Sequence, residues 1–286
     1  MYNRIALMFF IACPFFTGCD KAAKKQAGTQ QQGVLETPYL TYTQQLDVAD
    51  IQSAALAVKQ YCKLFTGAGQ DSCDEGFVIF ENFCKQQCNT LTQLVQNKEE
   101  YQSLVATDEW GVTRELTGEL KVFSNRLREN GYKVVLAGGK MMVVQDWDLV
   151  AARMSRFVSP DVNAYIARMN KEFKETVNVH TQVAVSPETL IENMIWRENF
   201  GAQHAAFILQ KDMKESHRTL LTSLMRGTDS VFFLSACAYL GRQYPASGTN
   251  KIVAPYYKAR QEHNLSFANA LLDRYYKQGY IYNAQR

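Results

Sequence analysis

Residues 77–95, FVIFENFCKQQCNTLTQLV, place apolar side chains along one side of a long helix. The apolar positions recur every three or four residues, which is the period of an amphipathic helix. The side chains that keep this spacing are Phe77, Phe80, Cys84, Cys88, Leu91 and Val95. This stretch therefore predicts a helix that buries one face against neighbouring elements.

Helical spacing extends along the chain in both directions from this stretch. Two later helices are marked by their starts, Ser159-Pro160-Asp161 and Ser186-Pro187-Glu188. Each start supplies an N-cap serine, a proline in the first turn and a carboxylate near the helix N-terminus. Further apolar series run over 51–65, 112–127 and 265–275. We predict a mainly α protein, built as a helical bundle or an array of helix pairs.

One segment departs from the helical period. Residues 132–136 and 141–145 are rich in residues that favour strands, and Ala137-Gly138-Gly139-Lys140 lies between them. This pattern predicts one small β-hairpin near 132–145, which must pack on helices because a lone hairpin is marginal in water. We expect an N-terminal helical region at 46–130, which holds a cysteine cluster, and a second region at 131–286 with the hairpin and the C-terminal helices.

The N-terminus has the pattern of an export signal. Arg4 precedes an almost unbroken apolar run over 5–16, which is too short to span a bilayer, since a spanning helix needs about 20 residues. The run ends in Phe16-Thr17-Gly18-Cys19, which resembles the lipobox of bacterial lipoproteins. The resemblance implies that residues 1–18 are a signal peptide and that Cys19 carries the lipid. The alternatives are an ordinary signal peptide cut near Gly18 and a cytosolic chain with an apolar start.

The same resemblance implies a place for the chain. A lipid on Cys19 would hold it to a membrane of the bacterial cell envelope, facing the periplasm, and Asp20 directly after the cysteine slightly favours the inner membrane. The residues that follow include KAAKKQAGTQQQG at 21–33, a polar stretch of low complexity. Such a composition buries little apolar surface, so we predict a flexible tether over 19–45.

Five cysteines remain in the body of the chain. In an oxidising periplasm, disulfides are expected within the cluster Cys62, Cys73, Cys84 and Cys88. The pairing stays open, because four cysteines allow three connectivities. Zinc is a weaker alternative, since the cluster has no C-x-x-C pair and no nearby histidine. Cys237 lies in the apolar run 231–240, which predicts a buried free thiol.

Composition and motifs exclude several classes of function. Net charge is only +3, with 31 basic and 28 acidic residues, so the chain lacks the basic excess of a nucleic-acid binder. Gly138-Gly139-Lys140 lacks the rest of a phosphate-binding loop, and no H-E-x-x-H or G-x-S-x-G motif is present. We therefore expect no nucleic-acid partner, no bound metal and no cofactor.

Histidines and carboxylates offer the remaining chemistry. His217 falls on an apolar helix face and is expected in the core or at an interface, whereas His204 lies off the main apolar stripe. Glu192 and Glu198 share a helix, and a buried Glu of raised pKa is the acid that cleaves glycans. Solvated charges on a helix face are the favoured interpretation of both. A peptidoglycan-acting hydrolase is the alternative function.

The C-terminal part interleaves tyrosines with basic residues. Such side chains are enriched at binding hot spots, although tyrosines at helical spacing also pack with their hydroxyls at the rim of a core. The candidate partner surface consists of Tyr256, Tyr257, Arg260, Arg274, Tyr275 and Tyr276.

Leu240-Gly241-Arg242-Gln243-Tyr244 resembles the L-G-x-x-Y element of tetratricopeptide helices. Tyr257 stands where that family has an aromatic residue, although Val253 and Arg260 replace residues that the family keeps small, and no second copy is found. The resemblance implies helix pairs packed side by side, a common platform for protein contacts. We expect a lipid-anchored, non-catalytic module that binds the bilayer through Cys19 and an envelope protein or cell-wall partner through its helices.

Overall fold

The computed structural model describes residues 35–105, 115–137, 140–176, 185–227 and 229–283. Its N-terminal part consists of α1 (Glu36–Gln45), α2 (Ser53–Phe65), α3 (Gln70–Gln96), the 3-10 helix η1 (Glu99–Val105), α4 (Gly118–Glu129), β1 (Tyr132–Ala137), β2 (Lys140–Gln145), α5 (Trp147–Met154) and α6 (Pro160–Thr176). Its C-terminal part consists of α7 (Pro187–Gln203), α8 (Gln210–Arg226), α9 (Ser230–Gln243), α10 (Gly248–Gln261) and α11 (Leu265–Lys277). The prediction of a mainly α protein with one small hairpin is confirmed.

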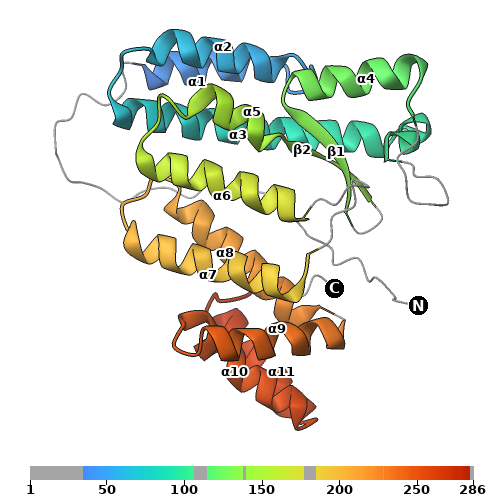
Figure 1. The fold of residues 1–286 in the computed structure, drawn as a ribbon, viewed down its shortest axis with the longest axis vertical. Helices are drawn as coiled ribbons and strands as arrows, with labels where there is room; N and C mark the ends of the chain where they lie inside the picture. Colours follow the sequence, from blue (N-terminus) through green and yellow to red (C-terminus); the bar gives the residue numbers. More distant parts are fainter. Residues whose placement is uncertain (1–34, 106–114, 138–139, 177–184, 228, 284–286) are drawn as a thin grey trace.

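The elements are stacked along the longest axis of the molecule (Figure 1). Helices α1 to α5 and the hairpin form one end, α6 lies beneath them, α7 and α8 come next, and α9 to α11 form the other end. The predicted serine caps are present, because Ser159 Oγ accepts from Val162 N at 3.3 Å and Ser186 Oγ accepts from Thr189 N at 3.0 Å. Among the described residues, no helix is both long and apolar enough to cross a bilayer.

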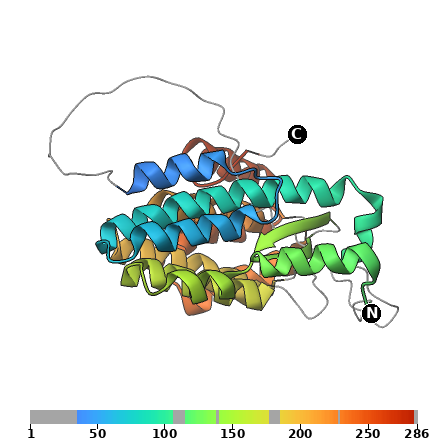
Figure 2. The same cartoon turned by 90° about the horizontal axis from the view of Figure 1, so that it is seen from above.

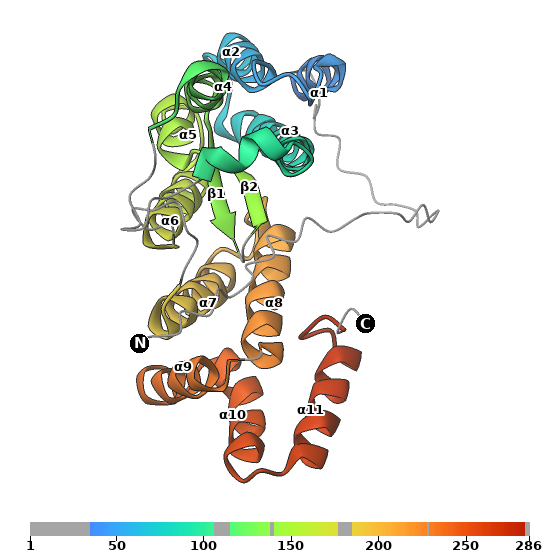
Figure 3. The same cartoon turned by 90° about the vertical axis from the view of Figure 1, so that its right-hand side faces the viewer.

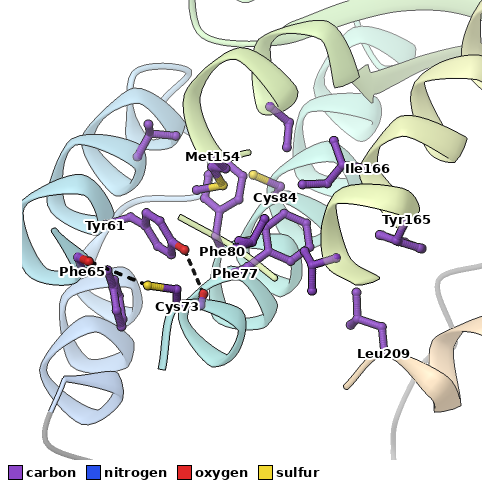
Figure 4. Packing of buried hydrophobic residues seen from close by; sticks show 14 of the residues in the cluster. Tyr61, Phe65, Cys73, Phe77, Phe80, Cys84, Met154, Tyr165, Ile166 and Leu209 are labelled. Carbon is purple, nitrogen blue, oxygen red and sulfur yellow. Dashed lines mark hydrogen bonds between the residues drawn. The ribbon is translucent and has the colours of Figure 1, made fainter. Parts of the chain in front are cut away.

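Helix α3 is the central element of the N-terminal end. It contacts α1, α2 and β2, and it buries the apolar face that the sequence predicts, including Phe77 and Leu91. The rings of Tyr61 and Phe65 press on the backbone of α3 where Gly76 stands, and a Cβ there would lie 2.5 Å from Phe65 Cζ. Figure 4 shows these two rings beside Cys73, with Tyr61 Oη donating to Cys73 O at 2.8 Å. Gly76 therefore sets how closely α2 approaches α3.

The hairpin is antiparallel, with Tyr132 opposite Gln145 and Ala137 opposite Lys140. Seen from above in Figure 2, it lies between the second half of α3 and α4. Side chains of α3 bond to the backbone of β2: Thr92 Oγ1 accepts from Val143 N at 2.9 Å, and Gln96 Nε2 donates to Met141 O at 2.6 Å. The helix thus covers a strand edge that would otherwise present unpaired backbone groups.

Two expectations about the boundaries of regions need correction. The tether was expected to reach residue 45, but 36–45 form α1, because the buried ring of Tyr39 packs against Tyr61 and Phe65 and its hydroxyl donates to Ala57 O at 3.1 Å. The hairpin was expected to open the C-terminal region, but its buried residues share a core with the second half of α3. The remainder of the predicted tether, Cys19 and the signal peptide lie outside the described residues.

The C-terminal helices enclose a core of their own. Helix α7 packs on α8 and also on α9, two helices later in the chain, and α10 packs on α9 and α11 (Figure 3). The N-terminal core continues into the first of these helices, because Phe200, Phe207, Leu209 and Met213 join its cluster. The two ends of the molecule are therefore connected through α6, α7 and α8.

Candidate functional site

Only some residues of the predicted partner surface are exposed to solvent. Tyr256 and Tyr275 are 2% and 3% exposed, so both belong to the core and cannot present their rings to a partner. Tyr256 Oη donates to Met225 O at 3.0 Å, and the guanidinium of Arg260 lies over the rings of Phe233 and Tyr256. Helical spacing alone did not reveal which tyrosines face the neighbouring helices.

The exposed remainder of that surface lies at the C-terminal end of α11. Arg274 and Tyr276 are exposed there, and Tyr280 just beyond the helix is exposed to the same extent as Tyr276. Tyr257 is half-buried, with its ring edge-on to Phe233 at 6.2 Å between centroids. A rim of aromatic and basic side chains is thus available for contact at this end of the chain.

The cysteine cluster contains no disulfide in the part of the chain that the structure describes. Cys62, Cys73, Cys84, Cys88 and Cys237 are thiols there, contrary to the predicted pairing within the first four. Cys73 and Cys84 are both on α3, about 16 Å apart along the helix at 1.5 Å per residue, which is too far for a bond. Cys84 and Cys88 are one turn apart, with Cβ atoms about 5–6 Å from each other where a disulfide needs about 3.8 Å.

The buried thiols are poorly suited to exchange chemistry. Burial raises the pKa of Cys73 and raises that of Cys84 well above the usual value, so both remain protonated at neutral pH. Cys237 is buried as predicted, and burial raises its pKa strongly. Since the thiolate is the nucleophile, these three cysteines act as small apolar core residues. No group of three or more metal-ligating side chains is found within the described ranges.

Glu192 and Glu198 are not solvated charges, because each connects α7 to a later element. Glu192 Oε1 accepts from the hydroxyls of Tyr239 at 2.6 Å and Tyr244 at 2.5 Å. Burial alone would raise the pKa of Glu192, but these two hydrogen bonds, together with the charges of Arg168 and Lys171, outweigh it and hold the pKa below its usual range. A glycan-cleaving acid needs the opposite shift.

Glu198 caps the N-terminus of α10. Its carboxylate accepts from the backbone N–H of Gly248 at 2.6 Å and of Thr249 at 2.8 Å, and also from Thr249 Oγ1 at 2.6 Å. These bonds outweigh burial and lower the pKa of Glu198. A carboxylate at this position satisfies orphan backbone donors and complements the helix dipole.

His217 and Thr249 complete this cap, and their donor roles can be assigned. The Thr249 hydroxyl gives its proton to Glu198, so it must accept the 2.9 Å hydrogen bond that it shares with His217 Nε2. His217 is therefore the donor, the reverse of a base that activates a nucleophile. Burial lowers the pKa of His217, which fits the predicted interface position.

The most extensive polar cluster links α6 to α7 and α8. We call it the polar joint, and it consists of Arg168, Glu172, Asn193, Arg197 and Ser216. Arg197 is buried and holds Glu172 through both carboxylate oxygens, at 2.6 and 2.7 Å. Its Nε donates to Ser216 Oγ at 2.9 Å, and Arg168 Nε donates to Glu172 at 2.9 Å.

His204 adds a second connection between the same layers. Its Nδ1 lies 2.9 Å from Asp161 Oδ2 in the first turn of α6, and its ring stacks on Phe200. The sequence pattern places His204 off the main apolar stripe of its helix, but nothing in that local pattern indicates that Asp161 is its partner. Together with the polar joint, this contact fixes α7 against α6.

Two of the described carboxylates, Asp74 and Glu81, have the raised pKa that a general acid requires, and burial is the main cause in both. Asp74 caps a neighbouring segment by accepting from Ser159 N at 2.8 Å. Glu81 of α3 is buried, and burial raises its pKa, although Lys85 Nζ lies 3.6 Å from its Oε1. Its Oε2 has no hydrogen-bond partner among the described residues. Lys85 also bonds to Asp212 of α8 at 2.6 Å, and this partly exposed pair lies where α3 meets α8, away from the exposed rim on α11.

Comparisons with known proteins identify no relative. The chain matches no family model, no curated protein and no solved structure.

Proposed function

We propose that the chain is a lipid-anchored protein of the bacterial envelope whose helical body binds a partner without catalysing a reaction. The observation that carries this proposal is Phe16-Thr17-Gly18-Cys19, preceded by Arg4 and an apolar run of signal-peptide length. Acyl chains on Cys19 would hold the chain to the bilayer, since each buried CH₂ contributes about 0.8 kcal/mol. Asp20 favours the inner membrane.

The chemistry of the helical body supports binding over catalysis. The two carboxylates considered for glycan cleavage have lowered pKa values and serve as helix connections. Within the part of the chain that the structure describes, the one histidine–hydroxyl hydrogen bond joins His217 to Thr249, and the histidine donates, which is the wrong direction for nucleophile activation. The exposed rim of Arg274, Tyr276 and Tyr280 is the surface we propose for an envelope protein or cell-wall partner.

The anchor is tested by Cys19→Ala, with Cys13→Ala in the apolar run as the matched control. Wild type and Cys13→Ala should incorporate labelled fatty acid and stay with membranes after an alkaline wash. Cys19→Ala should lose the label completely. Label that persists in Cys19→Ala, or that is missing from wild type, contradicts the anchor.

The binding role is tested by crosslinking in intact envelopes. The double variant Arg274→Glu, Tyr276→Ala should lose a crosslinked partner that wild type captures, whereas Val122→Ser, at another exposed apolar position, should keep it. Incubation with purified peptidoglycan tests the alternative function. Release of soluble glycan fragments by the pure protein would contradict a non-catalytic role.

A further inference from the structure

Helix α9 leaves one apolar face uncovered. Val231 is 74% exposed and Leu234 is 39% exposed, while Phe233, Ala236, Cys237 and Leu240 on the opposite side are buried. Residues 231, 234, 235, 238 and 242 recur at intervals of three or four and so share this outer face. We call these five residues the α9 face.

The sequence of α9 makes this exposure unusual. The run VFFLSACAYL at 231–240 is apolar on every side, and a helix of that kind is normally buried all round. Helices α7, α8 and α10 contact α9, and the burial of its residues shows that these contacts cover one side of the helix. The α9 face therefore has the composition of an interface rather than of a solvated helix surface.

Charge along the α9 face indicates what covers it. Asp229 stands at the N-cap, where its carboxylate accepts from Val231 N and Phe232 N, and Arg242 is exposed in the last turn. Between them the face carries no charge. A second copy of α9 packed antiparallel would bring the Arg242 of each chain to the Asp229 of the other, whereas a parallel copy would place arginine beside arginine.

The middle of the α9 face suits such a crossing. Ser235 and Ala238 are the two side chains nearest its centre, and small residues let two helices approach closely. An anionic membrane fits the face less well, because Asp229 offsets Arg242 and no further cation lies on it. We infer that two copies of this chain associate about a two-fold axis through antiparallel α9 helices.

The test is site-directed crosslinking in intact cells with a short bismaleimide. Ser235→Cys places a thiol next to the inferred axis, and Ser266→Cys, exposed on α11, is the matched control. Ser235→Cys should give a strong band at twice the mass of the single chain, at least ten times stronger than Ser266→Cys or the wild type. Equal bands at both positions, or none at Ser235→Cys, would overturn the inference.

A second variant tests the packing and the charge pattern. Ala238→Arg and Arg242→Glu, each in the Ser235→Cys background, should reduce the crosslinked band at least fivefold while the circular dichroism of the purified chain stays unchanged. An undiminished band in both variants would contradict pairing through the α9 face. The same crosslinking in Cys19→Ala separates this inference from the lipid anchor, because the dimer should form whether or not the chain is lipidated.

Discussion

The two ends of the molecule handle their apolar surface differently. Around α3, the neighbouring helices close over the core, and even the edge of β2 is bonded by helix side chains. At the other end, α10 packs on both α9 and α11. Exposed aliphatic side chains occur at both ends, but the exposed aromatic side chains of the described residues, Phe267, Tyr276 and Tyr280, all lie on α11 or just beyond it. The comparison favours the α3 end as the stable core of the fold and the α9–α11 end as the surface that we propose for contact with other molecules.

The largest effect is expected where the two ends are joined. Arg197→Leu removes the bidentate partner of Glu172 in the polar joint, while the Arg168 pair with Glu172 remains. Breaking a buried pair in this way costs about 3 kcal/mol of unfolding free energy. Chemical denaturation should show this loss as a lower transition midpoint.

The control is Lys171→Ala, which removes an exposed pair with Glu175 on the same helix. Exposed pairs contribute about 0.5 kcal/mol or less, so this variant should denature like wild type. Equal effects of the two substitutions would mean that the polar joint does not hold the ends together.

Two glycine substitutions, one at each end, are expected to change the free energy of unfolding in opposite directions and by a smaller amount. Gly76→Ala forces a methyl group into the rings of Tyr61 and Phe65 and should cost about 2 kcal/mol. Gly241→Ala on α9 meets no atom within 4 Å and should stabilise the helix by about 0.5–1 kcal/mol. Thermal melts of both variants measure the difference. A stabilised Gly76→Ala would show that α2 and α3 are not closely packed.

Sequence patterns predicted which helices and strands form better than they predicted which of them pack against each other. Apolar spacing was sufficient for α3, the Ser-Pro starts for α6 and α7, and the glycine turn for the hairpin. Helix α1 was missed because its ten residues bury only Tyr39 and Thr43, which leaves no recurring apolar pattern.

The contacts of the site were harder to predict, because they join residues far apart in the chain. Glu198 meets the N-terminus of α10 about 50 residues later, and local spacing contains no information about that distance. Tyr256 and Tyr275 show the same limit: each has the spacing of a helix face, but only the packing of the helices decides which face is buried. Val231 is exposed although it belongs to the apolar run 231–240, because the neighbouring helices cover only one side of α9.

The pH dependence of stability tests whether Glu81 at the α3 end is buried and retains its proton. Burial raises the pKa of Glu81 above its usual 4.5, so the folded state holds this proton more tightly than the unfolded state does. Its contribution is therefore greatest below pH 4.5 and is lost as pH rises through the folded pKa. Glu81→Gln mimics the protonated form and should be about 1 kcal/mol more stable than wild type at neutral pH.

The matched measurement is the same comparison at pH 4, where the gap between Glu81→Gln and wild type should shrink. Denaturant titrations at both pH values give the two differences. A gap that is constant with pH, or that widens in acid, would contradict a buried, proton-retaining Glu81.

Counting the reactive thiols of the purified chain tests whether the cysteine cluster at the α3 end contains disulfides. In denaturant, the purified chain without its signal peptide should titrate five thiols, Cys62, Cys73, Cys84, Cys88 and Cys237. Under native conditions the three buried thiols should react far more slowly. A single reactive thiol in denaturant would instead indicate two disulfides within the cluster.

The lipid anchor is tested most directly by the mass of the N-terminal peptide of protein purified from bacterial membranes. We predict a peptide that begins at Cys19 and carries the added mass of acyl chains, with none of residues 1–18 attached. An unmodified peptide that still begins at Met1 would contradict the anchor and the envelope function built on it.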